Sequence, residues 1–174
     1  MSTHIRDILN IDGYYTASHS HDNLMFFEDG IINVFYFKKS DNVDSIKTNM
    51  HKWANNQISW GTNWGVYRIE GDTIIGQFFW QGGILSTPSI FEYRYKIIDK
   101  KTIKKIYYKS LRKIDEKYYQ DNKISTWKDG DIYKYVPTDT LPSSDCWLKE
   151  EKWIWRNESD WKDYMEKIKQ KQKK

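Results

Sequence analysis

Apolar and polar residues alternate over several short runs of this chain, and a period of two indicates β-strands. The most regular run covers residues 90–98, where Phe91, Tyr93 and Tyr95 alternate with charged residues. Successive side chains of a strand point to opposite faces, so this run predicts a strand with one buried face and one wet face. A second run, residues 103–111, follows after a short polar turn. The two runs together predict an antiparallel hairpin.

The same hairpin pattern recurs along the chain. Residues 64–69 and 73–81 flank a turn that contains Gly71, and a similar turn contains Gly30. Glycine adopts positive φ without steric cost, which tight turns between strands require. Further short runs are residues 14–15, 24–27, 31–37, 117–119, 124–127, 132–136 and 152–156. The spacing of strand, helix and strand that a parallel sheet needs is absent, so we expect eight to ten antiparallel strands.

An antiparallel sheet of this size tends to close on itself, because closure removes exposed edges. The sequence therefore predicts an all-β fold, an antiparallel up-and-down β-barrel of about 8–10 strands. A two-sheet sandwich is the alternative, but its crossing connections fit sequential tight hairpins less well. About eight strands leave an interior that is either packed with side chains or able to hold one small ligand.

The last part of the chain changes to helical spacing. Trp161, Tyr164, Met165 and Ile168 share one helical face, and Ser159 is suited to the N-cap position. This predicts a C-terminal helix over residues 158–170, packed on the outside of a barrel formed by residues 9–157. A lysine-rich tail, residues 171–174, completes a single predicted domain over residues 1–174. Residues 40–61 are polar and suggest a short helix around Met50 or a loop.

Composition supports a β fold and removes nucleic acid as a partner. The chain has 9 Trp, 13 Tyr and 7 Phe, residues that suit a pleated surface. Its formal net charge is +4, but residues 162–174 carry six lysines against Asp163 and Glu166. That segment accounts for the whole excess, so the barrel body is neutral. Nucleic-acid binding needs a basic face on the folded body, which this distribution does not supply.

The order of elements resembles a known group of barrels. Gly13-Tyr14-Tyr15 opens the first strand, hairpin-linked strands follow, and an amphipathic helix ends the chain. Over residues 9–170 this order is similar to the lipocalin-like branch of the calycin barrels. Small bacterial proteins of that kind also contain a run like that of residues 64–74, Trp-Gly-x-Tyr-x-Ile-x-Gly-Asp-x-Ile. The resemblance implies a ligand-holding barrel with a C-terminal helix.

We expect aromatic residues to line the barrel interior and to bind a small hydrophobic or amphiphilic molecule. Tyr hydroxyls would meet the polar atoms of such a ligand, and Gly76 would leave space for it. The predicted ligand-binding residues are Phe35, Trp64, Tyr67, Phe78, Trp80, Tyr93, Tyr95 and Tyr107. Phe37 and Phe91 are also expected to point inward.

Beside ligand binding, one non-catalytic alternative and one catalytic alternative stay open at this point. The rings could fill the barrel, which would then be a structural or protein-interaction module with outward aromatics such as Tyr108, Trp153 or Trp155. Trp53, Trp60 and Trp64 would form a mouth with residues 40–57 as a flap, or would plug the barrel end. A barrel enzyme is the third option, and it requires a buried ionisable side chain in a pocket.

Other chemistry finds little support in the sequence. His19 and His21 would share a strand face without a third ligand, and His51 has no supporting metal or haem motif. Cys146 is the one cysteine, so no intrachain disulfide forms, and we interpret it as an ordinary thiol. Common catalytic motifs are missing, so we expect no catalytic residues, no metal and no cofactor.

Compartment and oligomeric state stay open. Residues 1–12 lack the apolar core of a secretory signal, which favours the cytoplasm for the sequence as it stands. Removal of a signal peptide would instead indicate export to the cell envelope. No apolar run is long enough for a transmembrane segment.

Overall fold

The computed structural model describes residues 5–20, 22–36, 43–54, 63–80, 89–110, 130–155 and 157–172. It contains two compact units, Met1–Pro142 and Ser143–Lys174. The first unit holds the barrel, and the second holds the C-terminal helices. The single domain over residues 1–174, with its terminal helix packed on the barrel, stays a prediction.

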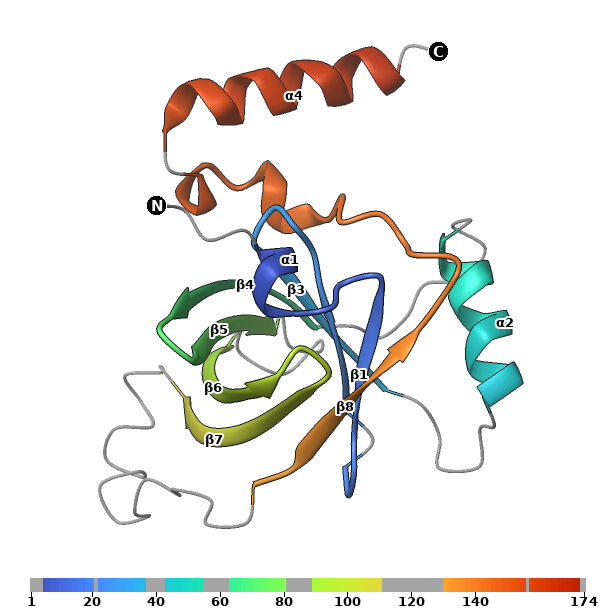
Figure 1. The fold of residues 1–174 in the computed structure, drawn as a ribbon. Helices are drawn as coiled ribbons and strands as arrows, with labels where there is room; N and C mark the ends of the chain where they lie inside the picture. Colours follow the sequence, from blue (N-terminus) through green and yellow to red (C-terminus); the bar gives the residue numbers. More distant parts are fainter. Residues whose placement is uncertain are drawn as a thin grey trace. The chain divides into compact units, whose positions relative to one another are not determined.

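Eight strands form a closed antiparallel barrel in which each strand pairs with its neighbours in sequence (Figure 1). The last strand closes against the first through five consecutive residue pairs, from Gly13 opposite Pro137 to Ala17 opposite Tyr133. The strands are β1 (Gly13–Ala17), β2 (Asp22–Phe26), β3 (Ile31–Tyr36), β4 (Asn63–Glu70), β5 (Thr73–Trp80), β6 (Ser89–Asp99), β7 (Thr102–Ser110) and β8 (Ile132–Pro137). This confirms the up-and-down barrel and excludes the sandwich. The runs at 117–119 and 124–127 lie outside the described residues.

Glycines at positive φ close two of the hairpins, as their sequence context predicts. Gly30, between β2 and β3, has a φ of 84°, and Gly71, between β4 and β5, has a φ of 60°. Residues with a Cβ are strained in this region, so glycine permits the tight reversal. Both turns lie at the same end of the barrel as the turn from β6 to β7.

A short N-terminal helix, α1 (Ile5–Ile8), closes this end of the barrel. Ile5, Leu9 and Ile11 are buried and belong to the same apolar cluster as the interior side chains of the strands. The backbone N–H of Asn10 donates to the carbonyl of Lys100 in the turn after β6 (3.0 Å). Apolar side chains from outside the sheet therefore fill the interior here, where barrel strands alone would leave an opening.

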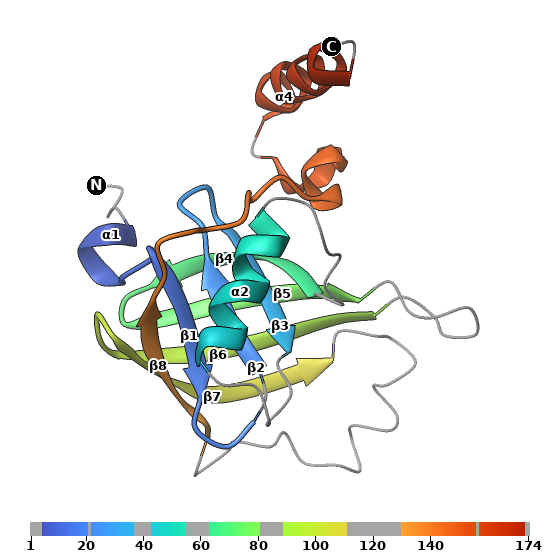
Figure 2. The ribbon, with the colours of Figure 1, turned by 90° about the vertical axis from the view of Figure 1, so that its right-hand side faces the viewer.

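A second helix, α2 (Val43–Ala54), lies across the outer face of β1, β2 and β3 (Figure 2). Met50 from this helix is fully buried against Tyr14, Met25 and Phe35. The helix confirms one of the two interpretations of residues 40–61. It also buries the outer face of the strands beneath it, so both faces of β3 are buried.

The second unit contains two 3₁₀ turns, Trp147–Glu150 and Lys152–Ile154, and the helix α4 (Glu158–Gln172). The predicted strand at 152–156 is wrong, because the chain there turns: the N–H of Trp155 donates to the carbonyl of Lys152 (3.2 Å). The C-terminal helix is confirmed, but its cap is Asn157 rather than Ser159. The Asn157 Oδ1 accepts the N–H of Asp160 (2.9 Å), while Ser159 donates its hydroxyl to that same oxygen (2.7 Å).

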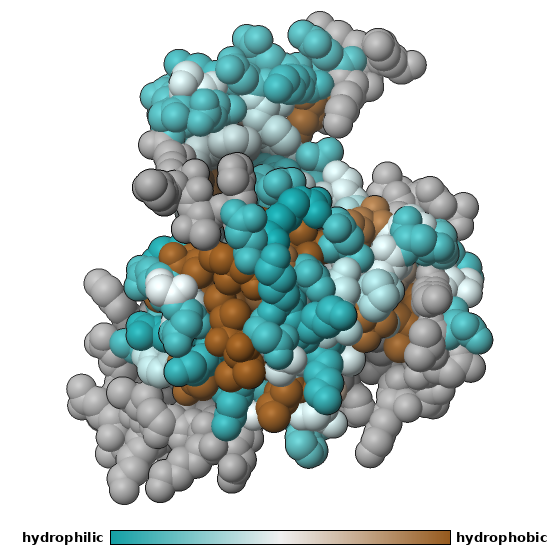
Figure 3. Space-filling model, viewed as in Figure 1, coloured by the Kyte–Doolittle hydropathy of each residue, from teal (hydrophilic) through white to brown (hydrophobic). Residues whose placement is uncertain are grey.

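Apolar side chains are also present on the surface. Figure 3 shows a band of apolar residues bordered by hydrophilic ones on the face drawn there. The large apolar residues that are exposed in the described chain are Tyr36, Ile90, Ile98, Ile132, Leu141 and Trp153. Single exposed apolar residues are ordinary in soluble proteins, and a contiguous band is the feature that interaction surfaces share.

Gly65 permits the close approach of β4 and β5. A Cβ at this position would lie 2.4 Å from the carbonyl oxygen of Gln77 and 3.0 Å from the ring of Phe78. We expect Gly65→Ala to lower the free energy of unfolding by about 3 kcal/mol, because a strand must shift. Gly71→Ala meets no atom within 4 Å and carries only the cost of its positive φ, about 1 kcal/mol. Urea unfolding of both variants tests this, and an equal or smaller loss at Gly65 would contradict it.

Candidate functional site

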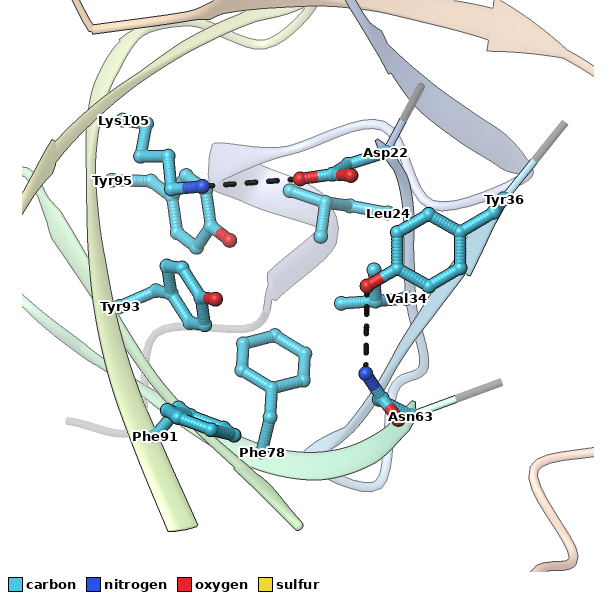
Figure 4. A pocket seen from close by; sticks show the side chains of 10 residues that line it. All are labelled: Asp22, Leu24, Val34, Tyr36, Asn63, Phe78, Phe91, Tyr93, Tyr95 and Lys105. Atoms are coloured by element: carbon cyan, nitrogen blue, oxygen red, sulfur yellow. Dashed lines mark hydrogen bonds and ion pairs between the residues drawn. The ribbon is translucent and has the colours of Figure 1, made fainter. Parts of the chain in front are cut away.

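The barrel encloses a cavity of about 300 Å³ at the end away from α1. Strands β2 to β7 all contribute to its wall, which combines aromatic rings with a few polar groups (Figure 4). The lining residues are Asp22, Leu24, Val34, Tyr36, Asn63, Phe78, Phe91, Tyr93, Tyr95 and Lys105. Asp22 begins β2, Tyr36 ends β3 and Asn63 begins β4, which places the cavity at the ends of these strands.

A charged pair lies on one side of the cavity. The Nζ of Lys105 is 3.8 Å from Oδ2 of Asp22, and the two side chains are only 10% and 27% exposed. The same Nζ lies 4.4 Å from the centre of the Tyr93 ring, a cation–π distance. Burial lowers the pKa of Lys105, against the opposing effect of Asp22 and Asp131. The desolvation of the ammonium group is therefore only partly offset by its neighbours.

A β-bulge follows Lys105 on β7. Arg94 pairs with Tyr107, but the next residue of β6, Tyr95, pairs with Lys105, so Ile106 is an extra residue on β7. A bulge shifts the alternation of faces by one residue. Lys105 therefore shares the inward face of Ile103, whereas Tyr107 faces outward and Tyr108 faces inward.

Tyrosine hydroxyls border the charged pair. In Figure 4 the hydroxyls of Tyr93 and Tyr95 point into the space between the labelled side chains. Burial raises the pKa of Tyr95 well above its usual value, and the charge of Asp22 adds to this effect. Burial also raises the pKa of Tyr36 and of Tyr133, and in both cases the charge of Asp22 is the second cause. These phenols therefore stay protonated and can both donate and accept hydrogen bonds.

A second polar pair lies across the cavity from the first. Asn63 Nδ2 donates to the hydroxyl oxygen of Tyr36 at 3.4 Å. Tyr36 is 47% exposed, so this pair reaches the solvent, whereas Leu24 and Val34 between the two pairs are buried. The cavity thus has an apolar floor and polar groups on two sides, an arrangement suited to an amphiphilic molecule.

Three of the predicted ligand-binding residues, Phe78, Tyr93 and Tyr95, line this cavity. Gly76 leaves no open space, because the Phe78 ring lies against it: a Cβ there would be 3.1 Å from that ring. The interior position of Phe91, which strand alternation also predicts, is confirmed.

Phe35 and Trp64 lie elsewhere. The predicted inward orientation of Phe35 is wrong, and Trp64, predicted to bind ligand at the barrel mouth or to plug the barrel end, does not line the cavity. Both belong to the cluster between the outer face of the sheet and α2, with Phe35 fully buried against Tyr14. Since α2 covers the outer face of β3, both faces of this strand are buried, and alternation could not identify the inward side. Tyr67 is interior but away from the cavity, where its hydroxyl donates to the carbonyl of Phe27 (2.7 Å).

Tyr107 does not have its predicted inward role, and the role of Trp80 stays a prediction. The guanidinium of Arg94 lies 4.7 Å from the Tyr107 ring centre on the outer face of the sheet, because of the bulge at Ile106. Trp80 ends β5, but its side chain lies outside the described residues, as do Phe37 and Trp60. The side chain of Trp53 also lies outside the described residues, so the predicted mouth of Trp53, Trp60 and Trp64 stays a prediction. Trp64 itself packs against Phe27.

The sequence prediction missed most polar groups of the site and both of its aliphatic side chains. The missed lining residues are Asp22, Leu24, Val34, Tyr36, Asn63 and Lys105. One signal was present: Lys105 is two residues from Ile103, and strict alternation places both on the same face. The prediction selected aromatic residues as the ligand-binding set and therefore left out Lys105.

Other candidate chemistry does not assemble into a site. The described part of the chain contains no group of three metal-ligating side chains. His51 hydrogen-bonds with the Thr140 hydroxyl through Nδ1 (2.9 Å), and its Nε2 lies 3.5 Å from Asp139. Cys146 is half-buried. Within the described ranges, no helix has the length and apolar character needed to span a membrane.

The filled-barrel alternative is only partly matched. It expected no internal cavity and outward aromatics. Trp153 is 56% exposed, as expected. Tyr108, however, lies inside beside Tyr93, with ring centres 5.0 Å apart, and the cavity is open.

Comparisons with known proteins yield no relative. No family model, no curated protein and no solved structure matches this chain. The closed eight-stranded barrel is consistent with a calycin-like fold, and membership of the lipocalins stays a prediction.

Two interior tyrosines provide a test of the burial of their hydroxyls. Among the described residues the Tyr133 hydroxyl is buried near the Ser20 hydroxyl without a hydrogen bond of good geometry, whereas that of Tyr67 donates to the carbonyl of Phe27. We expect Tyr133→Phe to leave the free energy of unfolding at pH 7 unchanged or higher, and Tyr67→Phe to lower it by about 1 kcal/mol. Urea titrations measure both, and a greater loss for Tyr133→Phe would contradict this placement.

The same variants differ from the wild type at alkaline pH. Burial raises the pKa of both phenols, so the unfolded chain ionises first, above about pH 10. Each buried phenol makes its full contribution to the free energy of unfolding below pH 10. Above pH 10 this contribution falls, by up to about 1.4 kcal/mol per pH unit for each tyrosine. Each variant removes one such group, so its free energy of unfolding should fall less steeply above pH 10. Identical slopes would contradict the raised pKa values.

Proposed function

We propose that this protein binds one small amphiphilic molecule in the barrel cavity, without catalysis. The observation that carries this proposal is a cavity of about 300 Å³ lined by five aromatic rings, two aliphatic side chains and a few convergent polar groups. That volume lies at the lower end of the range for small-molecule sites. It accommodates a molecule of one or two fused rings rather than a long lipid chain.

The distribution of polar groups supports an amphiphile over a pure hydrocarbon. Phe78, Leu24 and Val34 supply apolar surface, while Lys105 and Asp22 lie on one side. A ligand without polar atoms would leave the buried charged pair without the contacts that water gives it, which costs free energy. The ligand's apolar body therefore lies on the aromatic floor and its polar atoms face the pair.

A cavity-filling variant tests the site. Val34 is buried and faces the cavity, so Val34→Phe places a ring in the ligand volume. We expect it to weaken binding of the neutral fluorescent probe N-phenyl-1-naphthylamine at least tenfold, measured by fluorescence titration. Ile90→Phe adds the same ring on the outer face of β6 and should leave the affinity unchanged, since Ile90 is 39% exposed.

Thermal unfolding of both variants separates loss of the site from loss of the fold. Equal affinity of wild type and folded Val34→Phe would place the probe outside the barrel and contradict the proposal. Absence of saturable probe binding by the wild-type protein would contradict it as well.

The charged pair is also the observation that a barrel enzyme would require. Lys105 is a buried amine beside a carboxylate, the kind of pair that transfers protons. A bound ligand that is recovered chemically unchanged by mass spectrometry after prolonged incubation supports binding alone. Conversion that depends on Lys105 would assign catalysis instead.

A further inference from the structure

The spacing of the charged pair lets one ligand edge bond to both of its members from the cavity side. Lys105 Nζ and Asp22 Oδ2 are 3.8 Å apart, beyond the distance of roughly 2.7–2.9 Å for a direct charge-assisted hydrogen bond. Both groups line the cavity, one a donor and the other an acceptor. A ligand edge that carries an acceptor beside a donor can bond to both at once.

Ligands with a net charge fit this site poorly. A carboxylate near Lys105 would also lie near Asp22, so the attraction of one is largely cancelled by the repulsion of the other. An ammonium group near Asp22 meets the same opposition from Lys105. Neither charge would then recover the hydration that it loses in a buried site. Asp131, the residue before β8, adds a further negative charge near Lys105. This charge also disfavours an anionic ligand.

The aromatic wall favours a flat ligand body. The rings of Tyr93 and Tyr95 are close to parallel, with an interplanar angle of 22°. Phe91 stacks on Tyr108 at 21°, and Phe78 meets Tyr93 edge-on at 79°. Near-parallel rings direct their faces the same way, so a planar body that stacks on one of these rings makes larger contact than a branched chain.

Resting on the proposed binding function, we propose that the cavity selects planar, uncharged molecules whose polar edge carries a hydrogen-bond acceptor next to a donor, as in an aromatic amide or lactam. The carbonyl oxygen accepts from Lys105 Nζ, and the N–H donates to Asp22. The tyrosine hydroxyls of Tyr93 and Tyr95 are placed to meet further polar atoms of the same edge (Figure 4). Selection is therefore by charge state and edge pattern as well as by size.

Three ligands with the same apolar body test this selection. They are 2-naphthamide, 2-naphthoate and 2-naphthylmethylamine, which at pH 7 are neutral, anionic and cationic. We expect the full-length wild-type protein to bind the amide at least tenfold more tightly than either charged ligand, measured by competition with N-phenyl-1-naphthylamine. Equal or tighter binding of the naphthoate or of the amine would overturn the inference.

Two variants of the pair should shift the preference in opposite directions. Asp22→Asn removes the repulsive carboxylate, so naphthoate affinity should rise about tenfold relative to the amide. Lys105→Met leaves Asp22, so the preference should move toward the amine by a similar factor. A control, Lys104→Met, removes a neighbouring lysine of β7 that is not part of the cavity lining, and should change none of the ratios.

The outcomes separate this inference from the proposed function. If the neutral probe binds in the barrel but wild type shows no preference among the three ligands, the inference fails and the binding function stands. If neither probe nor ligands bind, the proposed function itself fails. If a variant unfolds, the ranking of the three ligands by the wild-type protein still decides the question. A ranking that follows nothing but the hydrophobicity of the ligands counts against selection by the charged pair.

Discussion

Closure of the sheet between β1 and β8 is the constraint on which the rest of this structure depends. Five consecutive residue pairs join Gly13–Ala17 to the end of the sheet, and they leave no free edge among the eight strands. Once the sheet is closed, each strand has an inward and an outward face, and eight strands leave an interior of limited width. The interior must then be filled by side chains, by another element or by a ligand.

The two ends of the barrel meet this requirement differently. At one end, α1 and the residues after it place Ile5, Leu9 and Ile11 among the interior side chains. At the other end the wall includes Lys105, Asp22 and tyrosine hydroxyls, which cannot pack as an apolar core. A buried charged pair contributes little net stability, because desolvation opposes its attraction. The open cavity and its polar lining are therefore features of one end, and a single barrel combines a packed core with a site.

Local register decides which residues form that site. The extra residue Ile106 separates Lys105, which faces the cavity, from Tyr107, which lies under Arg94 on the outside. Without the bulge, strict alternation would turn both residues to the same side. Phe35 shows the complementary difficulty: β3 is buried on both faces because α2 covers its outer side, so its sequence carries no alternation from which to identify the interior.

The sequence by itself determined the class and order of the structure. Period-two runs such as residues 90–98, glycines at Gly30 and Gly71, and helical spacing after residue 158 are local signals, and local geometry follows from them. It also identified Phe78, Tyr93 and Tyr95, which lie on strands with a regular pattern. Tertiary structure decided the remainder, because a bulge and a covering helix depend on partners distant in sequence. Only the closed barrel brings Asp22 of β2 within 3.8 Å of Lys105 of β7, and that pairing converts an aromatic interior into a site with a defined chemistry.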